Sequence, residues 1–213
     1  MEPKYFSSKD ISEMERLSRA AFINSLSGFK SASLIGTINQ KGNTNLSIFS
    51  SVVHLGSNPS LIGIVSRPDT TGRHTLQNIL KTNCFTINHI HPAIYTKAHQ
   101  TSARYDKDIS EFDATGLTPE FHQHMAAPYV KESFIKYGLS FAEKHELIIN
   151  GTTLIIGKIE EVFVPQQCIL PDGAIDIEKA ETITVSGLDS YHITKRLSRL
   201  TYAKTHKLPE DIL

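Results

Sequence analysis

Short runs of apolar and β-branched residues recur along the chain, and turn sequences separate them. The first run, SASLIGTIN (residues 31–39), stops at the turn sequence QKGN, and similar runs fill SLIGIVSR (60–67) and NCFTINHI (83–90). Runs of this length and composition, bounded by Gly, Pro, Asn or Ser, are typical of β-strands. We therefore predict a strand at each of the three positions.

The clearest topological signal lies in residues 134–164, where Asn150-Gly151 separates two long β-rich runs. An Asn-Gly pair readily adopts the positive φ angles of a tight hairpin turn. We therefore predict a long antiparallel hairpin. A second turn at PDGAI (171–175) and a last short strand at ETITVSG (181–187) follow it.

Two segments have apolar residues at helical spacing. Residues 10–27 predict an N-terminal surface helix with Asp10 or Ser12 as its cap. Residues 70–82 predict a second helix that lies between two strands and starts after a capping threonine. The expected cap is Thr70 or Thr71, and the expected inward-facing residues are Leu76, Ile79 and Leu80.

The strands and helices together predict one domain that spans residues 1–213, with a core at about 31–191. Their alternation is also compatible with a doubly wound parallel sheet. The long hairpin disfavours that fold, as does the lack of a GxGxxG or Walker loop. We therefore predict a mainly β protein in which six or seven antiparallel strands form a closed or partly closed barrel, with inserted and flanking helices.

Two segments do not fit this repeating pattern. Residues 101–130 predict a long irregular insertion, and loops of that length are often lids or subunit contacts. The alternative is a packed surface excursion. The tail, residues 195–213, is basic and includes KRLSRLTYAKTHK, which favours a solvated terminal helix over a basic surface for a phosphate-bearing ligand or partner.

Charge and hydropathy exclude several classes of protein. Lys and Arg together number 22, and so do Asp and Glu, so no overall basic field is available to attract nucleic acid. The N-terminal sequence MEPKYFSSKD lacks the apolar stretch of a secretory signal, and no apolar run is long enough to span a membrane. We expect a cytoplasmic protein that recognises its ligand locally.

Cysteine and histidine spacing gives no metal motif. Cys84 and Cys168 are the two cysteines, and their separation favours core thiols over a redox dithiol or a zinc site. His89 and His91 would share one face of a strand, but no acidic or thiol partner lies at a recognisable spacing. We therefore expect no metal.

Hydroxyl and amide side chains gather in GNTNLSIFSS (42–51), directly after the first predicted strand. Short neutral donors of this kind suit a phosphate or the polar edge of a flat heterocycle, beside which Phe49 would pack. Downstream, Arg73 and Thr75 lie at the start of a predicted helix, where free N–H groups favour an anion. Caps of ordinary turns are the alternative explanation.

The order of these segments resembles the flavin reductase-like family. Its first signature, Gly-x-x-Asn-x-x-Pro-x-Ser, is matched at Gly42, Asn45 and Ser50, with Ile48 in place of Pro. Its second, basic-Asp-Thr-x-x-Asn, is matched except that His74 replaces Asp. Further similar blocks are NPSLIGIVS, SEFDATGLTP, PYVKES and LPDGAID, so the resemblance runs from about residue 31 to residue 191.

The resemblance implies a Greek-key split barrel that binds FMN and forms a homodimer. It places a loop from residue 45 to residue 51 along the flavin ring and ribityl chain, and the start of the second helix at the phosphate. His74 in place of Asp removes a negative charge there, which favours an anion. The implied cofactor-binding residues are Asn45, Leu46, Ser47, Ile48, Phe49, Ser50, Ser51, Ser66, Arg67, Arg73, His74, Thr75, Asn78 and Tyr191.

The family also implies a choice of functions. The first is an enzyme that transfers hydride from NADH or NADPH to FMN and passes the reduced flavin on, for example to a monooxygenase. No catalytic residue is required, because the chemistry belongs to the cofactor. The alternatives are a flavoredoxin-like electron-transfer protein with tightly bound FMN, and a flavin-binding protein without turnover.

Overall fold

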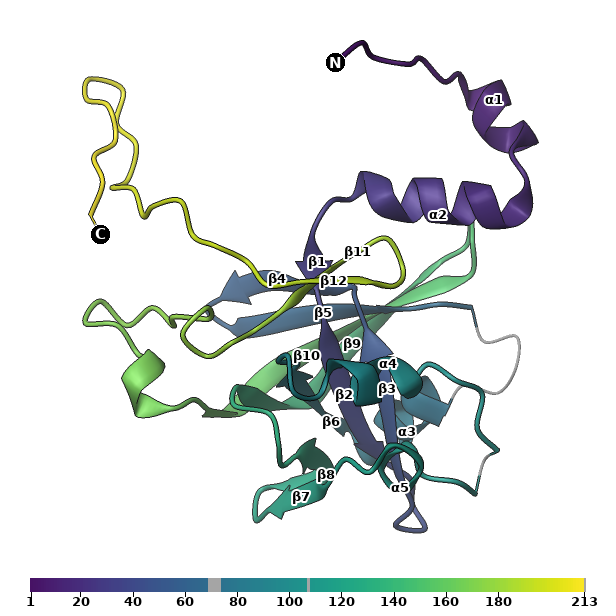
Figure 1. Ribbon diagram of the computed structural model, residues 1–213. Coiled ribbons are helices and arrows are strands. Elements are labelled where there is room, and N and C mark those ends of the chain that lie inside the picture. The colour runs from purple at the N-terminus through teal and green to yellow at the C-terminus, as the bar shows by residue number, and fades with distance from the viewer. Residues whose placement is uncertain (69–73, 107, 213) are drawn as a thin grey trace.

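The computed structural model describes residues 1–68, 74–106 and 108–212, and a seven-stranded antiparallel sheet forms its body (Figure 1). The strand order is β3-β2-β6-β9-β10-β5-β4. The bounds of these strands are β2 Ser33–Ile38, β3 Thr44–Phe49, β4 Val52–Ser57, β5 Ser60–Ser66, β6 Cys84–His89, β9 Lys136–Leu147 and β10 Thr152–Phe163.

Smaller elements surround this sheet. The helices are α1 Ser8–Glu13, α2 Arg16–Leu26, α3 His74–Thr82, α4 Tyr95–Gln100, α5 Glu111–Thr115 and the 3-10 helix η1 Gln166–Cys168. None of the described helices is long and apolar enough to cross a membrane. A three-stranded sheet contains β1 Lys30–Ser31, β11 Thr184–Ser186 and β12 Ser190–His192, and a two-stranded sheet contains β7 Pro119–His122 and β8 Met125–Val130.

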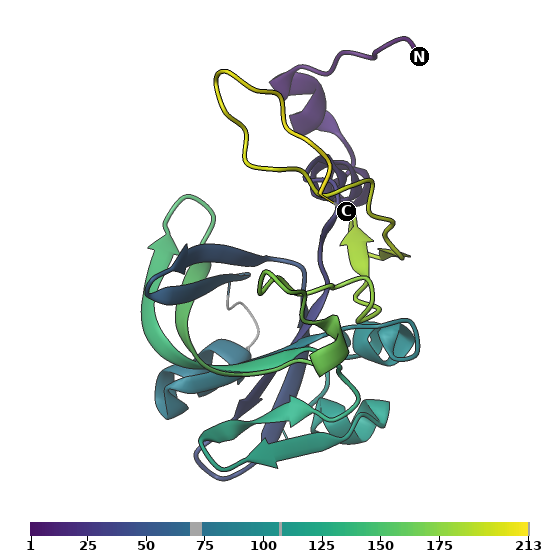
Figure 2. The ribbon, with the colours of Figure 1, turned by 90° about the vertical axis from the view of Figure 1, so that its left-hand side faces the viewer.

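The sheet curls into a partly closed barrel. Strands β3 and β4 are its two edges, yet only Ser50 and Ser51 separate them in the chain. The sheet must therefore curve until its edges come close, as the long bent strands β9 and β10 show in Figure 2. The backbone N–H of Val65 on β5 donates to the Ser51 carbonyl at 3.2 Å, which ties the link to the strand beside edge strand β4. The predicted antiparallel barrel is confirmed.

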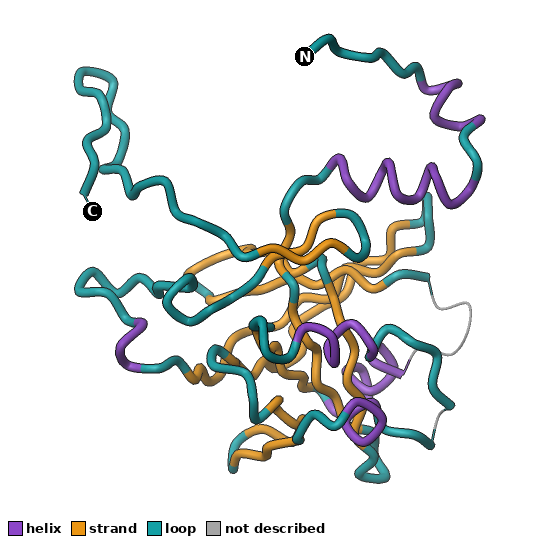
Figure 3. The backbone as a smooth tube through the Cα atoms, viewed as in Figure 1, coloured by secondary structure: helices purple, strands orange, loops and turns teal. Residues whose placement is uncertain are grey.

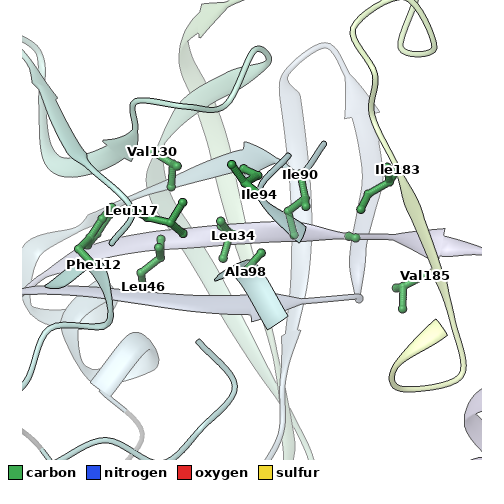
Figure 4. Packing of buried hydrophobic residues seen from close by; sticks show 11 residues of the cluster. Leu34, Leu46, Ile90, Ile94, Ala98, Phe112, Leu117, Val130, Ile183 and Val185 are labelled. Carbon is green, nitrogen blue, oxygen red and sulfur yellow. The ribbon is translucent and has the colours of Figure 1, made fainter. Parts of the chain in front are cut away.

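Both faces of the central strands are buried. Because successive side chains of a strand point to opposite faces, neighbouring residues of one strand belong to two different clusters. On β2, Ile35 belongs to a cluster with Ile64, Phe85 and Leu139, which α3 covers through Ile79. Leu34, the residue before it on β2, belongs to a second cluster that α4, α5 and β8 cover (Figure 4). That cluster is Ala32, Leu34, Leu46, Ile90, Ile94, Ala98, Phe112, Leu117, Val130, Ile183 and Val185.

The predicted hairpin is confirmed, with β9 and β10 paired antiparallel on either side of residues 148–151. Of the Asn-Gly pair, only Gly151 has a positive φ, at 69°. The Asn150 carboxamide instead accepts hydrogen bonds from the backbone N–H and the hydroxyl of Thr152. The turn is therefore longer than the two-residue turn that an Asn-Gly pair favours.

The single helix predicted over residues 10–27 is wrong, because the chain forms α1 and α2 with a break at Met14. Ser7 caps α1, because its hydroxyl accepts from the backbone N–H of Asp10. The Asp10 carboxylate in turn accepts from the backbone N–H of Ser7, which completes a capping box. The Glu15 carboxylate then accepts from the backbone N–H groups of Leu17 and Ser18. This second cap starts a new helix at a position where the spacing of apolar residues predicted that the first helix would continue.

The segment from Asn45 to Ser51 was expected to be a loop, but its residues 45–49 belong to strand β3. The next strand, β4, was not predicted. Both strands are sheet edges, so each has one unpaired side and lacks the continuous apolar run of a central strand. The second predicted helix is present as α3, although the capping candidates Thr70 and Thr71 lie outside the described residues.

Within α3, Ile79 is fully buried and Leu76 packs against the same cluster, as predicted. Leu80 was wrongly placed on the inward face, because its side chain is 37% exposed. The cysteines behave as expected for structural thiols, with Cys168 buried and Cys84 partly buried. Among the described residues, no group of three or more His, Cys, Asp or Glu is arranged to hold a metal ion.

The structure bears on two predictions about irregular segments, and for the insertion it supports the alternative of a packed excursion. Residues 101–130 contain α5, β7 and β8, and their Phe112 and Tyr129 are fully buried, so much of this insertion is a packed excursion. The predicted C-terminal helix is wrong. Residues 195–212 form an exposed loop with isolated bridges (Figure 3), and Leu197 is fully exposed. A short helix without a packed face gains too little to form.

Candidate functional site

A cavity of about 480 Å³ lies where strands β3 and β4 meet. It collects ten of the fourteen residues that the sequence assigned to a site, although they come from three separate stretches of chain. Those ten are Asn45, Ser47, Ile48, Phe49, Ser50, Ser51, Ser66, Arg67, His74 and Thr75.

Three other assigned residues do not line the cavity. Leu46 is fully buried in the second core cluster, as alternation along β3 requires. Asn78 is buried on α3, and its carboxamide donates to the Thr37 hydroxyl at 3.1 Å. Tyr191 packs against the second core cluster. Arg73, the last of the fourteen, lies outside the described residues.

Hydrogen bonds between side chains hold α3 against the edge of the barrel. Asn45 on β3 donates from Nδ2 to the Thr75 hydroxyl at 3.1 Å, and Asn78 makes the equivalent bond to β2 one turn later. These two buried amides set the position of the first turn of α3. His74 and Thr75 are therefore held beside the polar side chains of β3.

The link between the two edge strands presents hydroxyl groups to the cavity. Ser51 is held in place, because its hydroxyl donates to the Val65 carbonyl at 2.9 Å. Ser47 and Ser50 make no side-chain hydrogen bond within the described part of the chain, so their hydroxyls remain available to a ligand. Arg67, just after β5, supplies a cation to the same lining.

Sequence reasoning missed the rest of the lining. It consists of Val65 on β5, His99 at the end of α4, the stretch from Thr101 to Tyr105, Glu111 at the start of α5, and Leu188 between β11 and β12. Glu111 lies in the block SEFDATGLTP, which carried part of the family resemblance but no assigned site residue. For residues 101–105 the unusual length of the 101–130 insertion was the available signal, since such loops often border sites.

Glu111 is the acidic group of this cavity. Its Oε2 accepts a hydrogen bond from the backbone N–H of Leu46 at 2.9 Å, and so satisfies a donor on the open edge of β3. Burial raises the pKa of the Glu111 carboxyl, and the Leu46 hydrogen bond and the nearby His74 oppose that rise. Arg67 and Arg104 line the same space, so cationic groups outnumber this single carboxyl among the described lining residues.

His99, which lines the cavity, forms a polar pair with Tyr191, which lies behind the lining. The Nδ1 atom of His99 lies 2.9 Å from the Tyr191 hydroxyl oxygen, although 92 positions separate the two residues. The Tyr191 ring also packs against Tyr95, with ring centroids 5.5 Å apart. Burial, with a smaller effect of the Asp189 carboxylate, raises the pKa of Tyr191. The phenol therefore keeps its proton at neutral pH.

Known proteins match this architecture. The family model described as "Flavin reductase like domain" matches residues 27–171. A protein from Shewanella frigidimarina NCIMB 400, provisionally assigned as a flavin reductase with a split barrel domain, is 53% identical, with a TM-score of 0.91 over 94% of this chain and 100% of that chain. These matches confirm the split barrel expected from the sequence motifs.

More distant structures share the fold. Nitrilotriacetate monooxygenase component B from Bacillus cereus is 17% identical, with a TM-score of 0.82 over 93% of this chain and 100% of that chain. Flavoredoxin from Desulfovibrio vulgaris (Miyazaki F) is 24% identical, with a TM-score of 0.69 over 84% of this chain and 91% of that chain. At these identities the similarity shows the fold and not a shared activity.

Proposed function

The chain belongs to the flavin reductase-like family, and we propose that it binds FMN and reduces it with NADH or NADPH. The observation that carries this proposal is the single cavity on which ten sequence-assigned residues converge. Its volume falls within the roughly 300–1,000 Å³ of small-molecule sites.

The donor set of the cavity suits FMN. Ser47 and Ser50 supply hydroxyls for the polar edge of a flavin or for its ribityl chain. His74 and Thr75 begin a nine-residue helix whose first N–H groups favour a phosphate, and Arg67 adds a positive charge. Riboflavin lacks the phosphate and would leave these groups without an anion.

The flavin would supply the redox chemistry by accepting a hydride, and the chain would bind and orient it. The side-chain bonds from Asn45 to Thr75 and from Asn78 to Thr37 fix the helix start before any ligand arrives. Because such a site is already ordered, ligand binding loses little free energy to the ordering of side chains. No acid or base in the chain is required for the hydride transfer.

We also propose that the protein is a homodimer. Helices α1 and α2 and the C-terminal segment extend away from the barrel (Figures 1 and 2). Apolar side chains on these segments and on the link between α2 and β1 lie open, with Leu17 62%, Leu26 66%, Phe29 67% and Tyr202 89% exposed. Apolar groups gathered on extended arms favour a protein interface, and a second copy is the partner that the family resemblance implies. Sedimentation as a monomer would contradict this.

Flavin and nucleotide titrations test the main proposal. The purified protein should bind about one FMN per chain, more tightly than riboflavin, and should oxidise NADH or NADPH when FMN is present. Failure to bind any flavin would refute the proposal. Binding of FMN without nicotinamide oxidation would instead favour a flavoredoxin-like carrier or a flavin-binding protein without turnover. Supply of reduced flavin to a monooxygenase is the further role to test once turnover is established.

A further inference from the structure

We propose that His99, oriented by Tyr191, donates a hydrogen bond from Nε2 to the carboxamide oxygen of the nicotinamide that reduces the flavin. This inference rests on the proposed function. It assigns a nucleotide-recognition role to a residue that belongs to neither of the two sequence motifs.

The first step is the protonation of the His99 ring. Among the described residues, His99 Nδ1 is the hydrogen-bond partner of the Tyr191 hydroxyl, at 2.9 Å. Either atom of this pair can be the donor, depending on the tautomer of the imidazole. In the tautomer that this proposal assigns, the neutral phenol donates its proton to Nδ1 and the imidazole proton is on Nε2. Nε2 is then the donor that the ring presents to a ligand.

The second step is the orientation of that donor. Tyr191 is anchored on β12 against the second core cluster, and its ring packs on Tyr95 and against the edge of the His99 ring. His99 is itself an exposed residue near the end of α4, but it lines the cavity. Nε2 has no partner in the described part of the chain. A fixed donor with nothing to bond is thus left at the edge of the site.

The third step is the ligand that meets this donor. The sequence-assigned residues that line the cavity come from β3, the β3–β4 link, the end of β5 and the start of α3, whereas His99 belongs to the part contributed by α4 and residues 101–105. We expect a flavin bound along the first group to have one ring face toward the rest of the cavity. Hydride transfer requires the nicotinamide to approach a flavin face closely. The carboxamide oxygen is the acceptor on that nicotinamide ring.

Two substitutions of His99 separate the roles of its nitrogens. In His99→Gln the amide reaches the position of Nε2, and in His99→Asn it reaches the position of Nδ1 and leaves Nε2 without a replacement. With FMN bound, His99→Asn should weaken equilibrium binding of NAD⁺ roughly tenfold, the effect of about one hydrogen bond. His99→Gln should retain most of that affinity. FMN affinity should stay unchanged in both, and His54→Asn, an exposed histidine on β4, is the matched control.

Tyr191→Phe tests the positioning role by a readout that does not need a ligand. Nitrogen-15 NMR of the imidazole should show the Nε2–H form of His99 in the wild type and a mixture of tautomers in Tyr191→Phe. In kinetics, the same variant should raise the KM for NADH or NADPH more than it lowers kcat.

The outcomes distinguish this inference from the function on which it rests. Loss of FMN affinity in His99→Asn, equal loss in both His99 variants, or unchanged NAD⁺ affinity in both would overturn the assignment of His99 while FMN binding still stood. Wild-type protein that binds FMN but not NAD⁺ would overturn it as well. Absence of FMN binding in the wild type would refute the proposed function itself.

Discussion

Mild acid should destabilise this fold through His89, which lies on β6 with its Nδ1 atom 3.1 Å from the Thr182 hydroxyl and its ring centroid 6.2 Å from that of Tyr137. Burial lowers the pKa of His89 to about 4, from an ordinary value of 6.5. The folded state therefore keeps this imidazole neutral at a pH where the unfolded chain already binds a proton. Stability is lost as the pH falls from 6.5 toward 4.

The size of this effect follows from the two pKa values. Proton uptake by the unfolded state alone costs about 2 kcal/mol of folding stability at pH 5 and about 3 kcal/mol at pH 4, and almost none at pH 7. A loss of that size is a large fraction of the roughly 5–15 kcal/mol that stabilises a typical domain.

Urea unfolding at pH 7, 6 and 5 measures this loss. His89→Asn keeps a hydrogen-bonding group at the position of Nδ1, near Thr182, but removes the titration, so it should lose about 2 kcal/mol less than the wild type between pH 7 and pH 5. The carboxyl groups that titrate in this range are common to both proteins. His54→Asn, which removes an exposed histidine on β4, should follow the wild type. Parallel losses in wild type and His89→Asn would show that His89 is not the cause.

Three further predictions address packing, the cavity carboxyl and the phosphate. Gly36→Ala should destabilise the fold by about 1–3 kcal/mol in urea unfolding, because its Cβ would overlap the Pro128 carbonyl oxygen and lie 2.5 Å from the Thr86 hydroxyl; an unchanged midpoint would show that β8 moves away freely. The raised pKa of Glu111 means that the folded state holds this proton more tightly than the unfolded state, so the wild type loses stability as the pH rises from 4.5 through the pKa of the folded protein. Glu111→Gln does not titrate and should therefore become progressively more stable relative to the wild type over that range. A constant difference in stability would contradict this. Arg73→Ala should weaken FMN binding about ten- to a hundredfold with little effect on riboflavin, and equal losses for both flavins would mean that the phosphate lies elsewhere.

Local sequence patterns were sufficient for most of the barrel. The strand predicted at residues 31–39 is β2, the Asn-Gly turn does lie between β9 and β10, and the motif around Asn45 does border the cavity. In each case neighbouring residues carry the information, because strand alternation and turn conformation depend on residues a few positions apart. The predicted C-terminal helix failed for the converse reason: its charge pattern permitted a helix, but no packed face was available to stabilise one.

The tertiary structure alone decided the rest of the cavity lining. His99 meets Tyr191 across 92 positions, and Glu111 reaches the Leu46 backbone across 65. Such contacts have no period or motif, since each arises only when the sheet has curled and the insertion has packed against it. Sequence by itself determined the central strands, the long hairpin and the motif residues that border the cavity, but not the edge strands β3 and β4. The second part of the cavity lining was decided by how the edges of one sheet are brought together, which depends on the packing of the whole chain.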